Sequence, residues 1–202
     1  MNAEPPAVGL AGVLKSLNGD RGYGIALVAS LALLLLPELA PGAREALSYQ
    51  REGLGQGQWW RLLTAHFVHL DLEHAVLNAL GLLLMWALFA RDYPPLRWLV
   101  IYLGAALAVS AGLWMFNPQI AWYVGASGAL HGVMTAGTLA HLRRGDLDGW
   151  ILAAFIVAKL AYEQISGALP LAGSPDTVVD AHLYGAIGGA VLALLSRPLR
   201  PS

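Results

Sequence analysis

Six long apolar stretches follow one another along this chain of 202 residues, and they constrain its fold more than any other feature. A membrane-spanning helix needs about 20 mostly apolar residues. Six stretches reach or nearly reach that length: residues 22–40, 74–90, 96–116, 125–142, 149–168 and 178–196. The stretches are unbroken and lack the alternation of barrel strands, so they predict helices. We therefore expect an all-α membrane protein, a bundle of six transmembrane helices.

The composition agrees with a membrane location. The chain is 57% hydrophobic and 12% charged, whereas soluble domains average about 25% charged residues. A formal net charge of −1 without a basic cluster argues against a nucleic-acid partner. The absence of cysteine excludes disulfides, thiolate zinc sites and cysteine nucleophiles. Membrane lipid is the expected surrounding.

The chain reads as one domain, because it has no linker or repeat. Residues 1–21 do not form a secretory signal peptide and are expected to be a cytoplasmic N-terminal segment. Residues 22–196 form the six-helix domain and residues 197–202 a cytoplasmic tail. The topology rests on the basic residues that share one side if the helices alternate: Lys15, Arg21, Arg91, Arg97, Arg143, Arg144, Arg197 and Arg200. The positive-inside rule then places both termini in the cytoplasm.

Ser127 lies at the outward start of the fourth stretch, in the sequence Gly125-Ala126-Ser127-Gly128. The start of a helix carries unpaired N–H groups and a partial positive charge, which would stabilise an oxyanion forming beside the serine. Gly125 and Gly128 permit unusual backbone angles and close approach. Taken alone, this motif is more often a packing feature of membrane helices.

His182 lies near the outward end of the sixth stretch, at the depth of Ser127. Gly185 and Gly189 share one face of that helix, and the fourth stretch has two glycines at the same spacing. Such faces allow the close approach that a hydrogen bond between the serine and the histidine requires. A nucleophile and a base are the parts that covalent hydrolysis needs. A buried histidine bonded across helices is the alternative.

His74 and Asn78 are four residues apart on the second stretch, so they share one helical face. Both can donate hydrogen bonds to a developing oxyanion; the alternative is interhelical bonding. No carboxylate is expected to complete a triad. Asp180 would project away from His182, and Glu163 follows Lys159 by four residues, which predicts that those two pair with each other. The residues therefore favour a Ser127–His182 dyad.

In order and spacing, these motifs resemble those of the rhomboid intramembrane serine proteases. The matching elements are Trp60-Arg61, His74-x-x-x-Asn78, Gly125-x-Ser127-Gly128 and Ala181-His182-x-x-Gly185-x-x-x-Gly189, which together span about residues 59–189. The resemblance implies a six-helix bundle with a water-filled cavity open to the outer face. It implies cleavage of a transmembrane protein substrate that crosses the membrane once, near the outer membrane face, without a metal or cofactor.

The resemblance also implies roles for individual residues. Ser127 would be the nucleophile, and His182 the general base and then the general acid. His74, Asn78 and the backbone N–H of Ser127 would form the oxyanion hole. His69 matches a loop histidine that is structural in relatives.

His131 departs from the pattern, because many rhomboids carry tyrosine four residues after the serine. Its imidazole would stack on or hydrogen-bond near His182, or take up a proton near neutral pH. Together with the short stretch from Gly125 to Gly132, it resembles the bacterial rhombosortase branch. That branch is associated with trimming proteins that carry a C-terminal glycine-glycine motif, a membrane helix and a basic tail. The resemblance implies a multi-pass protein of the bacterial inner membrane.

Two other functions stay open. A proteolytically inactive rhomboid-like protein would bind membrane partners, although such relatives generally lack the serine or the histidine. A metal-dependent membrane enzyme or transporter would use the six histidines, but no HExxH motif occurs. The oligomeric state cannot be derived, since glycine-rich helix faces pack within one chain as well as between chains.

Overall fold

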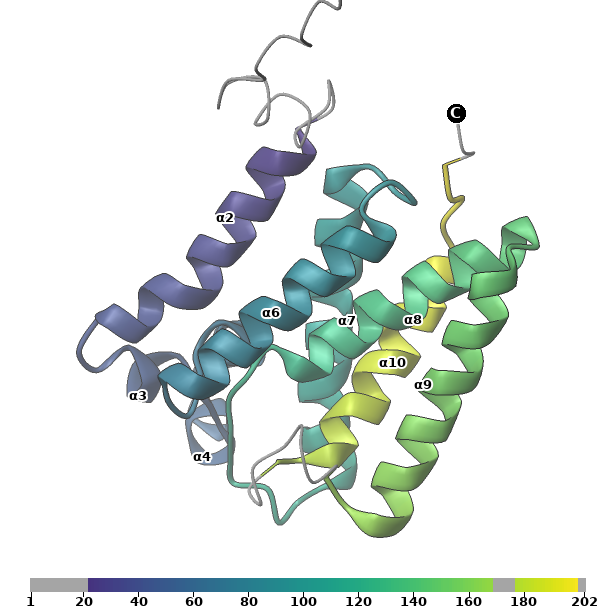
Figure 1. Cartoon of the computed structure of the whole chain (residues 1–202). Helices are drawn as coiled ribbons and strands as arrows, with labels where there is room; N and C mark the ends of the chain where they lie inside the picture. Colours follow the sequence, from purple (N-terminus) through teal and green to yellow (C-terminus); the bar gives the residue numbers. More distant parts are fainter. Residues whose placement is uncertain (1–21, 169–176, 200–202) are drawn as a thin grey trace, which may run out of the picture.

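The fold is a bundle of helices, seen in a computed structural model that describes residues 22–168 and 177–199. Its long helices are α2 (Tyr23–Leu35), α6 (Leu72–Phe89), α7 (Pro95–Phe116), α8 (Ser127–Arg144), α9 (Leu147–Ser166) and α10 (Val179–Leu194) (Figure 1). The 3-10 helix η2 (Leu36–Leu39) extends α2. With η2 counted as part of α2, each helix begins and ends within two residues of an apolar stretch, so the expected all-α fold is confirmed. The whole N-terminal segment 1–21, the end of the tail and most of the loop 169–177 lie outside the described residues.

Helix α8 lies inside the bundle, where it packs against α6, α7, α9 and α10. Eleven of its 18 residues are buried. Its polar and small residues are therefore covered by neighbouring helices, which is how a helix of low hydrophobicity is tolerated at membrane depth. In Figure 1, α8 runs between α6 and the pair α9 and α10.

The outer helices present apolar side chains to their surroundings. Within the described chain, α6 and α7 alone are long and apolar enough to cross a membrane by length and composition, whereas α2 with η2 and α10 are shorter apolar helices. Leu77, Leu80 and Leu84 of α6 are all about half exposed. Such a continuous apolar surface suits lipid contact rather than water.

Glycines bring α8 and α10 into backbone contact. A Cβ atom added at Gly185 would collide with the carbonyl oxygen of Gly128, and one added at Gly189 would collide with that of Gly132. No side chain separates the two helices at these levels. The structure thus holds the start of α10 directly against the start of α8.

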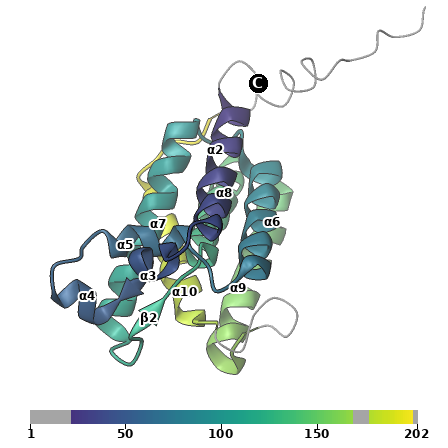
Figure 2. The same ribbon diagram turned by 90° about the vertical axis from the view of Figure 1, so that its left-hand side faces the viewer.

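The long first loop folds into short elements: α3 (Ala43–Leu47), β1 (Tyr49–Gln50), α4 (Arg51–Gly55), α5 (Arg61–Thr64) and η3 (Ala65–Phe67). Strand β1 pairs antiparallel with β2 (Trp122–Tyr123), and Tyr49 lies opposite Tyr123. Figure 2 shows these elements gathered at one end of the bundle. Arg51 donates to the carbonyl oxygens of Leu113 and Asn117 at the end of α7, at 2.6 and 3.1 Å. The loop is therefore packed onto the bundle.

Trp60 and Arg61 hold this loop together. The Arg61 side chain is buried and donates to the carbonyl oxygens of Glu45 and Ser48, at 2.9 and 2.7 Å. The Trp60 ring is 53% exposed and donates from Nε1 to the carbonyl oxygen of Ala46. Arg61 has a structural position, and Trp60 presents its ring to the surroundings.

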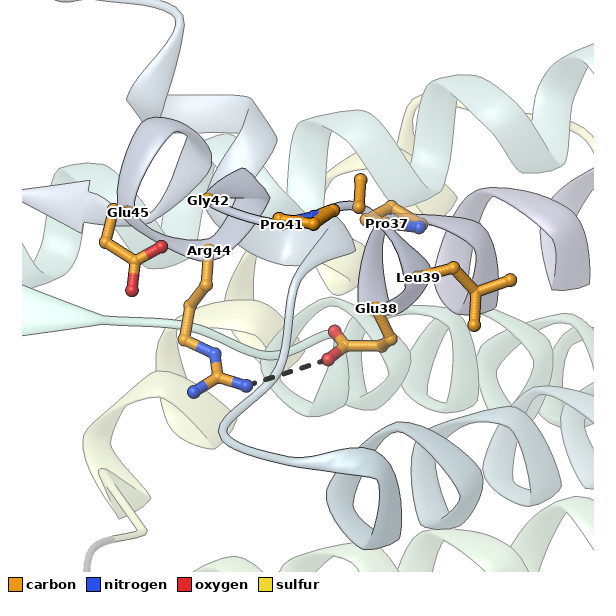
Figure 3. Close-up of a pocket in the computed structure, with 8 residues that line it drawn as sticks. Pro37, Glu38, Leu39, Pro41, Gly42, Arg44 and Glu45 are labelled. Atoms are coloured by element: carbon orange, nitrogen blue, oxygen red, sulfur yellow. Dashed lines mark ion pairs between the residues drawn. The ribbon is translucent and has the colours of Figure 1, made fainter.

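A pocket lies where η2 meets α3, and Glu38 is among the residues that line it (Figure 3). The Glu38 carboxylate pairs with Arg44 at 3.9 Å and accepts a hydrogen bond from the backbone N–H of His69 at 2.9 Å. His69 is fully buried, and its ring meets that of His74 edge to face, with centroids 5.2 Å apart. Through these contacts Glu38 connects the end of the first long helix with the segment leading into α6.

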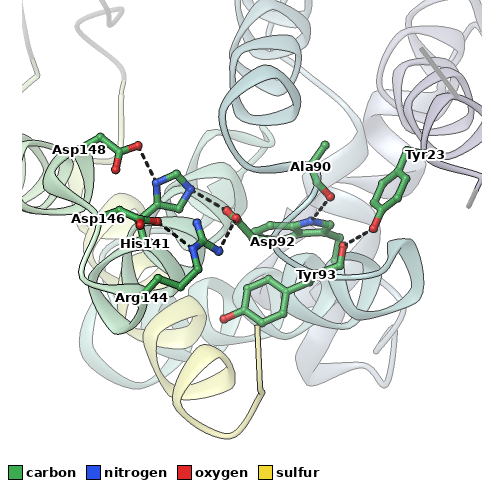
Figure 4. A network of polar contacts seen from close by, with 9 residues as sticks. Tyr23, Ala90, Asp92, Tyr93, His141, Arg144, Asp146 and Asp148 are labelled. Atoms are coloured by element: carbon green, nitrogen blue, oxygen red, sulfur yellow. Dashed lines mark hydrogen bonds and ion pairs between the residues drawn. The ribbon is translucent and has the colours of Figure 1, made fainter. Parts of the chain in front are cut away.

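Charged side chains hold the opposite end of the bundle together (Figure 4). Asp92, in the loop between α6 and α7, accepts hydrogen bonds from Arg144 at 2.8 Å and from His141 at 3.0 Å. The Tyr23 hydroxyl donates to the carbonyl oxygen of Tyr93, and the Leu199 N–H donates to that of Asp92. The start of α2 and the last described residues thus meet at one end. We call it the basic end, from its basic residues Arg91, Arg97, Arg143, Arg144 and Arg197.

We expect acid to destabilise the fold through His66 of η3. Its side chain is fully buried against the Ser110 hydroxyl, 3.0 Å from Nε2, and burial lowers the pKa of His66 from 6.5 to about 4. The unfolded chain binds the proton more tightly than the folded chain. The stability that His66 contributes is therefore complete above pH 6.5 and is lost as the pH falls toward 4. Thermal unfolding in detergent across this range measures the decline, which should be smaller in His66→Gln. Equal declines in the two proteins would contradict this role.

Candidate active site

Ser127 and His182 meet between two helices that are distant in the sequence. Ser127 is the first residue of α8, and His182 lies in the first turn of α10. The Ser127 Oγ and His182 Nε2 atoms are 3.1 Å apart, and His182 is 5% exposed. When Nε2 is unprotonated, the serine hydroxyl donates to it, which is the contact that activates a serine nucleophile.

The other nitrogen of His182 contacts a carboxylate. His182 Nδ1 lies 3.0 Å from Glu163 Oε2, and Lys159 Nζ donates to Glu163 Oε1 at 2.6 Å. The expected pair of Lys159 and Glu163 is present, but the prediction that no carboxylate reaches His182 is wrong. A carboxylate has two oxygens, so pairing with lysine leaves one for the imidazole. Asp180 is turned elsewhere and accepts from the Asn117 amide at 2.6 Å.

Glu163 is therefore the site residue that sequence reasoning missed. A usable signal is the alternation of the helices, because it puts the end of α9 at Ser166 on the same side of the bundle as the starts of α8 and α10. Glu163 lies within one turn of that end, at the depth expected for Ser127 and His182.

His131 packs on the face of His182. The two rings are stacked, with centroids 4.1 Å apart and an angle of 16° between their planes. His131 Nδ1 lies 2.7 Å from the Ser127 carbonyl oxygen, so Nδ1 carries the proton and donates. Of the two expected arrangements, the structure has stacking on His182, together with a hydrogen bond back to the serine residue.

His74 of α6 lies beside the backbone that precedes the serine. Gly125 has a φ of 120°, and a Cβ atom there would lie 3.2 Å from His74 Nε2. Because His74 Nδ1 accepts from the Leu70 N–H at 3.4 Å, Nε2 carries the proton. The donor nitrogen of His74 thus faces Gly125, two residues before Ser127.

Asn78 is buried one turn further along α6. Its Nδ2 donates to the His74 carbonyl oxygen at 2.9 Å, which leaves the second hydrogen of the amide for another acceptor. The Ser127 N–H belongs to the first residue of α8 and has no acceptor within the helix. His74 thus lies against the Gly125 segment, whereas the hydrogen bond of Asn78 is to its own helix.

Among the residues that the structure describes, two groups of histidine and carboxylate side chains have ligand atoms within 4.8 Å of one another: His131, Glu163 and His182; and His141, Asp146 and Asp148. In the first group, both nitrogens of His182 and both oxygens of Glu163 already have hydrogen-bond partners. A cation there would compete with the serine for His182. The second group lies at the basic end, away from Ser127. The absence of a metal or cofactor stays a prediction.

Comparison with known proteins gives the family. The family model described as the Rhomboid domain matches residues 56–198. Three relatives come from Bacillus subtilis (strain 168) and Arabidopsis thaliana. "Putative rhomboid protease YdcA" is 27% identical over 152 residues, 75% of this chain and 74% of that protein. "Rhomboid protease GluP" is 37% identical over 83 residues, 41% of this chain and 16% of that protein. "Rhomboid-like protein 11, chloroplastic", from Arabidopsis, is 29% identical over 146 residues, 68% of this chain and 52% of that protein.

The fold and the site define an integral membrane protein, an all-α bundle with a serine and a histidine in contact between its helices. The chain belongs to the rhomboid family. It spans about three quarters of the YdcA protein, about half of the Arabidopsis protein and a small part of GluP.

Proposed function

We propose that this protein is an intramembrane serine endopeptidase that acts through Ser127 and His182. The observation that supports the proposal is the 3.1 Å contact between Ser127 Oγ and His182 Nε2, from residues 55 positions apart on two helices. The names of two Bacillus relatives, both described as rhomboid proteases, favour the same activity.

The reaction proceeds by acyl transfer. His182 Nε2 takes the proton of the Ser127 hydroxyl as Oγ bonds to the carbonyl carbon of the scissile peptide. The resulting oxyanion is bound by the N–H of Ser127, with His74 Nε2–H and the Asn78 amide as further donors. The intermediate then collapses, and the departing amine takes the proton from His182. A water molecule, deprotonated by His182, hydrolyses the acyl-enzyme and restores the serine.

The substrate in this proposal is a membrane protein with one transmembrane helix, cleaved near the outer face. Arg143 and Arg144 lie at the last turn of α8, whereas Ser127 lies at its first residue. The positive-inside rule then places the basic end in the cytoplasm and Ser127 toward the opposite face. This orientation gives cytoplasmic termini, and the resemblance to the bacterial rhombosortase branch favours a location in the bacterial inner membrane. His131 favours the rhombosortase-like branch and substrates that carry a C-terminal glycine-glycine signal.

The experiment is labelling of the purified protein with a fluorophosphonate, which reacts with activated serines, alongside cleavage of a single-span substrate. Ser127→Ala should lose both labelling and cleavage. Ser166→Ala removes an exposed serine at the end of α9 and should behave like the wild type. Unlabelled wild-type protein would contradict the proposal and favour an inactive rhomboid-like protein that binds membrane partners. Substantial cleavage by Ser127→Ala would show that cleavage follows another mechanism.

A further inference from the structure

We propose that Glu163 is a positioning residue that holds His182 in the tautomer able to accept the Ser127 proton. This inference rests on the proposed function, and it extends the predicted dyad into a series of three side chains from three helices: Ser127 of α8, His182 of α10 and Glu163 of α9. Its basis is the pair of contacts at the two nitrogens of His182, 3.1 Å to the Ser127 Oγ and 3.0 Å to the Glu163 Oε2.

The chemistry of these contacts selects one tautomer. An ionised carboxylate only accepts hydrogen bonds, so the His182 nitrogen that faces Glu163 must carry a proton. With the proton on Nδ1, Nε2 has a lone pair and accepts from the serine hydroxyl. The other tautomer would direct a lone pair at the carboxylate and an N–H at Ser127, and it could not act as a base toward the serine.

Lys159 allows Glu163 to be ionised inside the bundle. The Glu163 side chain is 3% exposed, and an isolated buried carboxylate would be strongly disfavoured. Lys159, four residues earlier on α9 and 12% exposed, donates to Oε1 at 2.6 Å. The lysine thus balances the charge of the carboxylate through Oε1, and Oε2 stays available to His182.

The carboxylate matters most when His182 is charged. Once the imidazole has taken the serine proton, a cation lies 3.0 Å from the Glu163 carboxylate, so Glu163 stabilises the transition state more than the free enzyme. Among the described residues, His131 is stacked on the ring of His182, and His74 lies beside Gly125 on the serine side of the site. Neither one offers an anion that could replace the carboxylate.

The test compares a variant that removes the charge of Glu163, a variant that keeps it, and a control at a neighbouring carboxylate. In Glu163→Gln we expect kcat and the rate of fluorophosphonate labelling to fall by about 100-fold or more, with KM little changed. Glu163→Asp should recover part of the rate, because it keeps an anion. Asp180→Asn is the matched control, since Asp180 lies two residues from His182 but contacts Asn117, and it should label at close to the wild-type rate.

A second variant separates positioning from folding. Lys159→Met with Glu163→Gln removes both charges together, and replacing a buried ion pair by neutral side chains is often neutral or stabilising. We expect this protein to unfold at close to the wild-type temperature and yet to remain about 100-fold slow. Nitrogen-15 NMR of the histidines should show His182 protonated at Nδ1 in the wild type and a mixture of tautomers in the double variant.

Wild-type kcat and labelling in the folded double variant would overturn the role of Glu163 and leave Ser127 and His182 as a dyad. An unlabelled wild type would instead overturn the proposed function itself, so the two failures are distinguishable. An unchanged His182 tautomer in the double variant would also contradict the inference.

Discussion

His182→Ala should lose substrate cleavage and fluorophosphonate labelling of Ser127 together, by about 10⁴-fold or more. The Ser127 hydroxyl lies 3.1 Å from His182 Nε2, which accepts its proton. Without the imidazole, water is the proton acceptor that remains. The side chain removed is the only base placed against Oγ by the contacts of the described residues. Labelling kinetics measured in detergent give the result directly, without knowledge of the natural substrate.

The matched control is His141→Gln. His141 is buried as His182 is, but it lies at the basic end, where it contacts Asp92 and Asp148. This variant should keep the wild-type labelling rate even where its thermal stability is lower. Labelling of His182→Ala at near the wild-type rate would show that another group activates the serine.

Gly185→Ala should give the second large effect, on stability and activity together. The added Cβ would overlap the Gly128 carbonyl oxygen, so α8 and α10 must move apart. Overpacking of this kind typically costs 1–3 kcal/mol. Because the separation acts one turn from His182, it also displaces His182 from Ser127, and a displacement of about 1 Å can cost about 100-fold in rate. Thermal unfolding and the labelling rate measure the two effects.

Gly81→Ala is the control for this substitution. Gly81 lies within α6, and its added Cβ would meet only the Leu130 Cδ1 atom, at an ordinary contact distance of 3.4 Å. Alanine is the better helix former by about 1 kcal/mol, so this variant should be as stable as the wild type or more so. If Gly185→Ala matched Gly81→Ala in stability and rate, close approach of the two helices would not be what positions the site.

The helices could be predicted from the sequence because span length and apolar content act locally. Once η2 is counted with α2, the six stretches predict the ends of the helices to within two residues, even in α8, whose small and polar residues are buried by neighbours. The elements of the first loop could not be predicted in this way. The pairing of Tyr49 with Tyr123 joins residues that are far apart in the sequence, and no local pattern indicates it.

The candidate site also has a part that could be predicted from the sequence and a part that could not. Ser127 and His182 were predicted to meet because alternating helices place both at the outward level. Glu163 was missed because its spacing from Lys159 suggested a complete local pair. The contact of Glu163 with His182 depends on where α9 lies relative to α10, which spacing within one helix does not contain.

The charges of Lys159 and Glu163 pair with each other, and Glu163 holds His182 Nδ1, without any contribution from the serine hydroxyl. Loss of that hydroxyl leaves no stranded ion in the interior, whereas loss of the carboxylate leaves an ammonium group without its counter-ion. A single replacement at position 127 is therefore enough to turn an active ancestor into an inactive descendant that still folds. We therefore expect that, in descendants that no longer need cleavage, Ser127 is replaced earlier than Lys159 or Glu163.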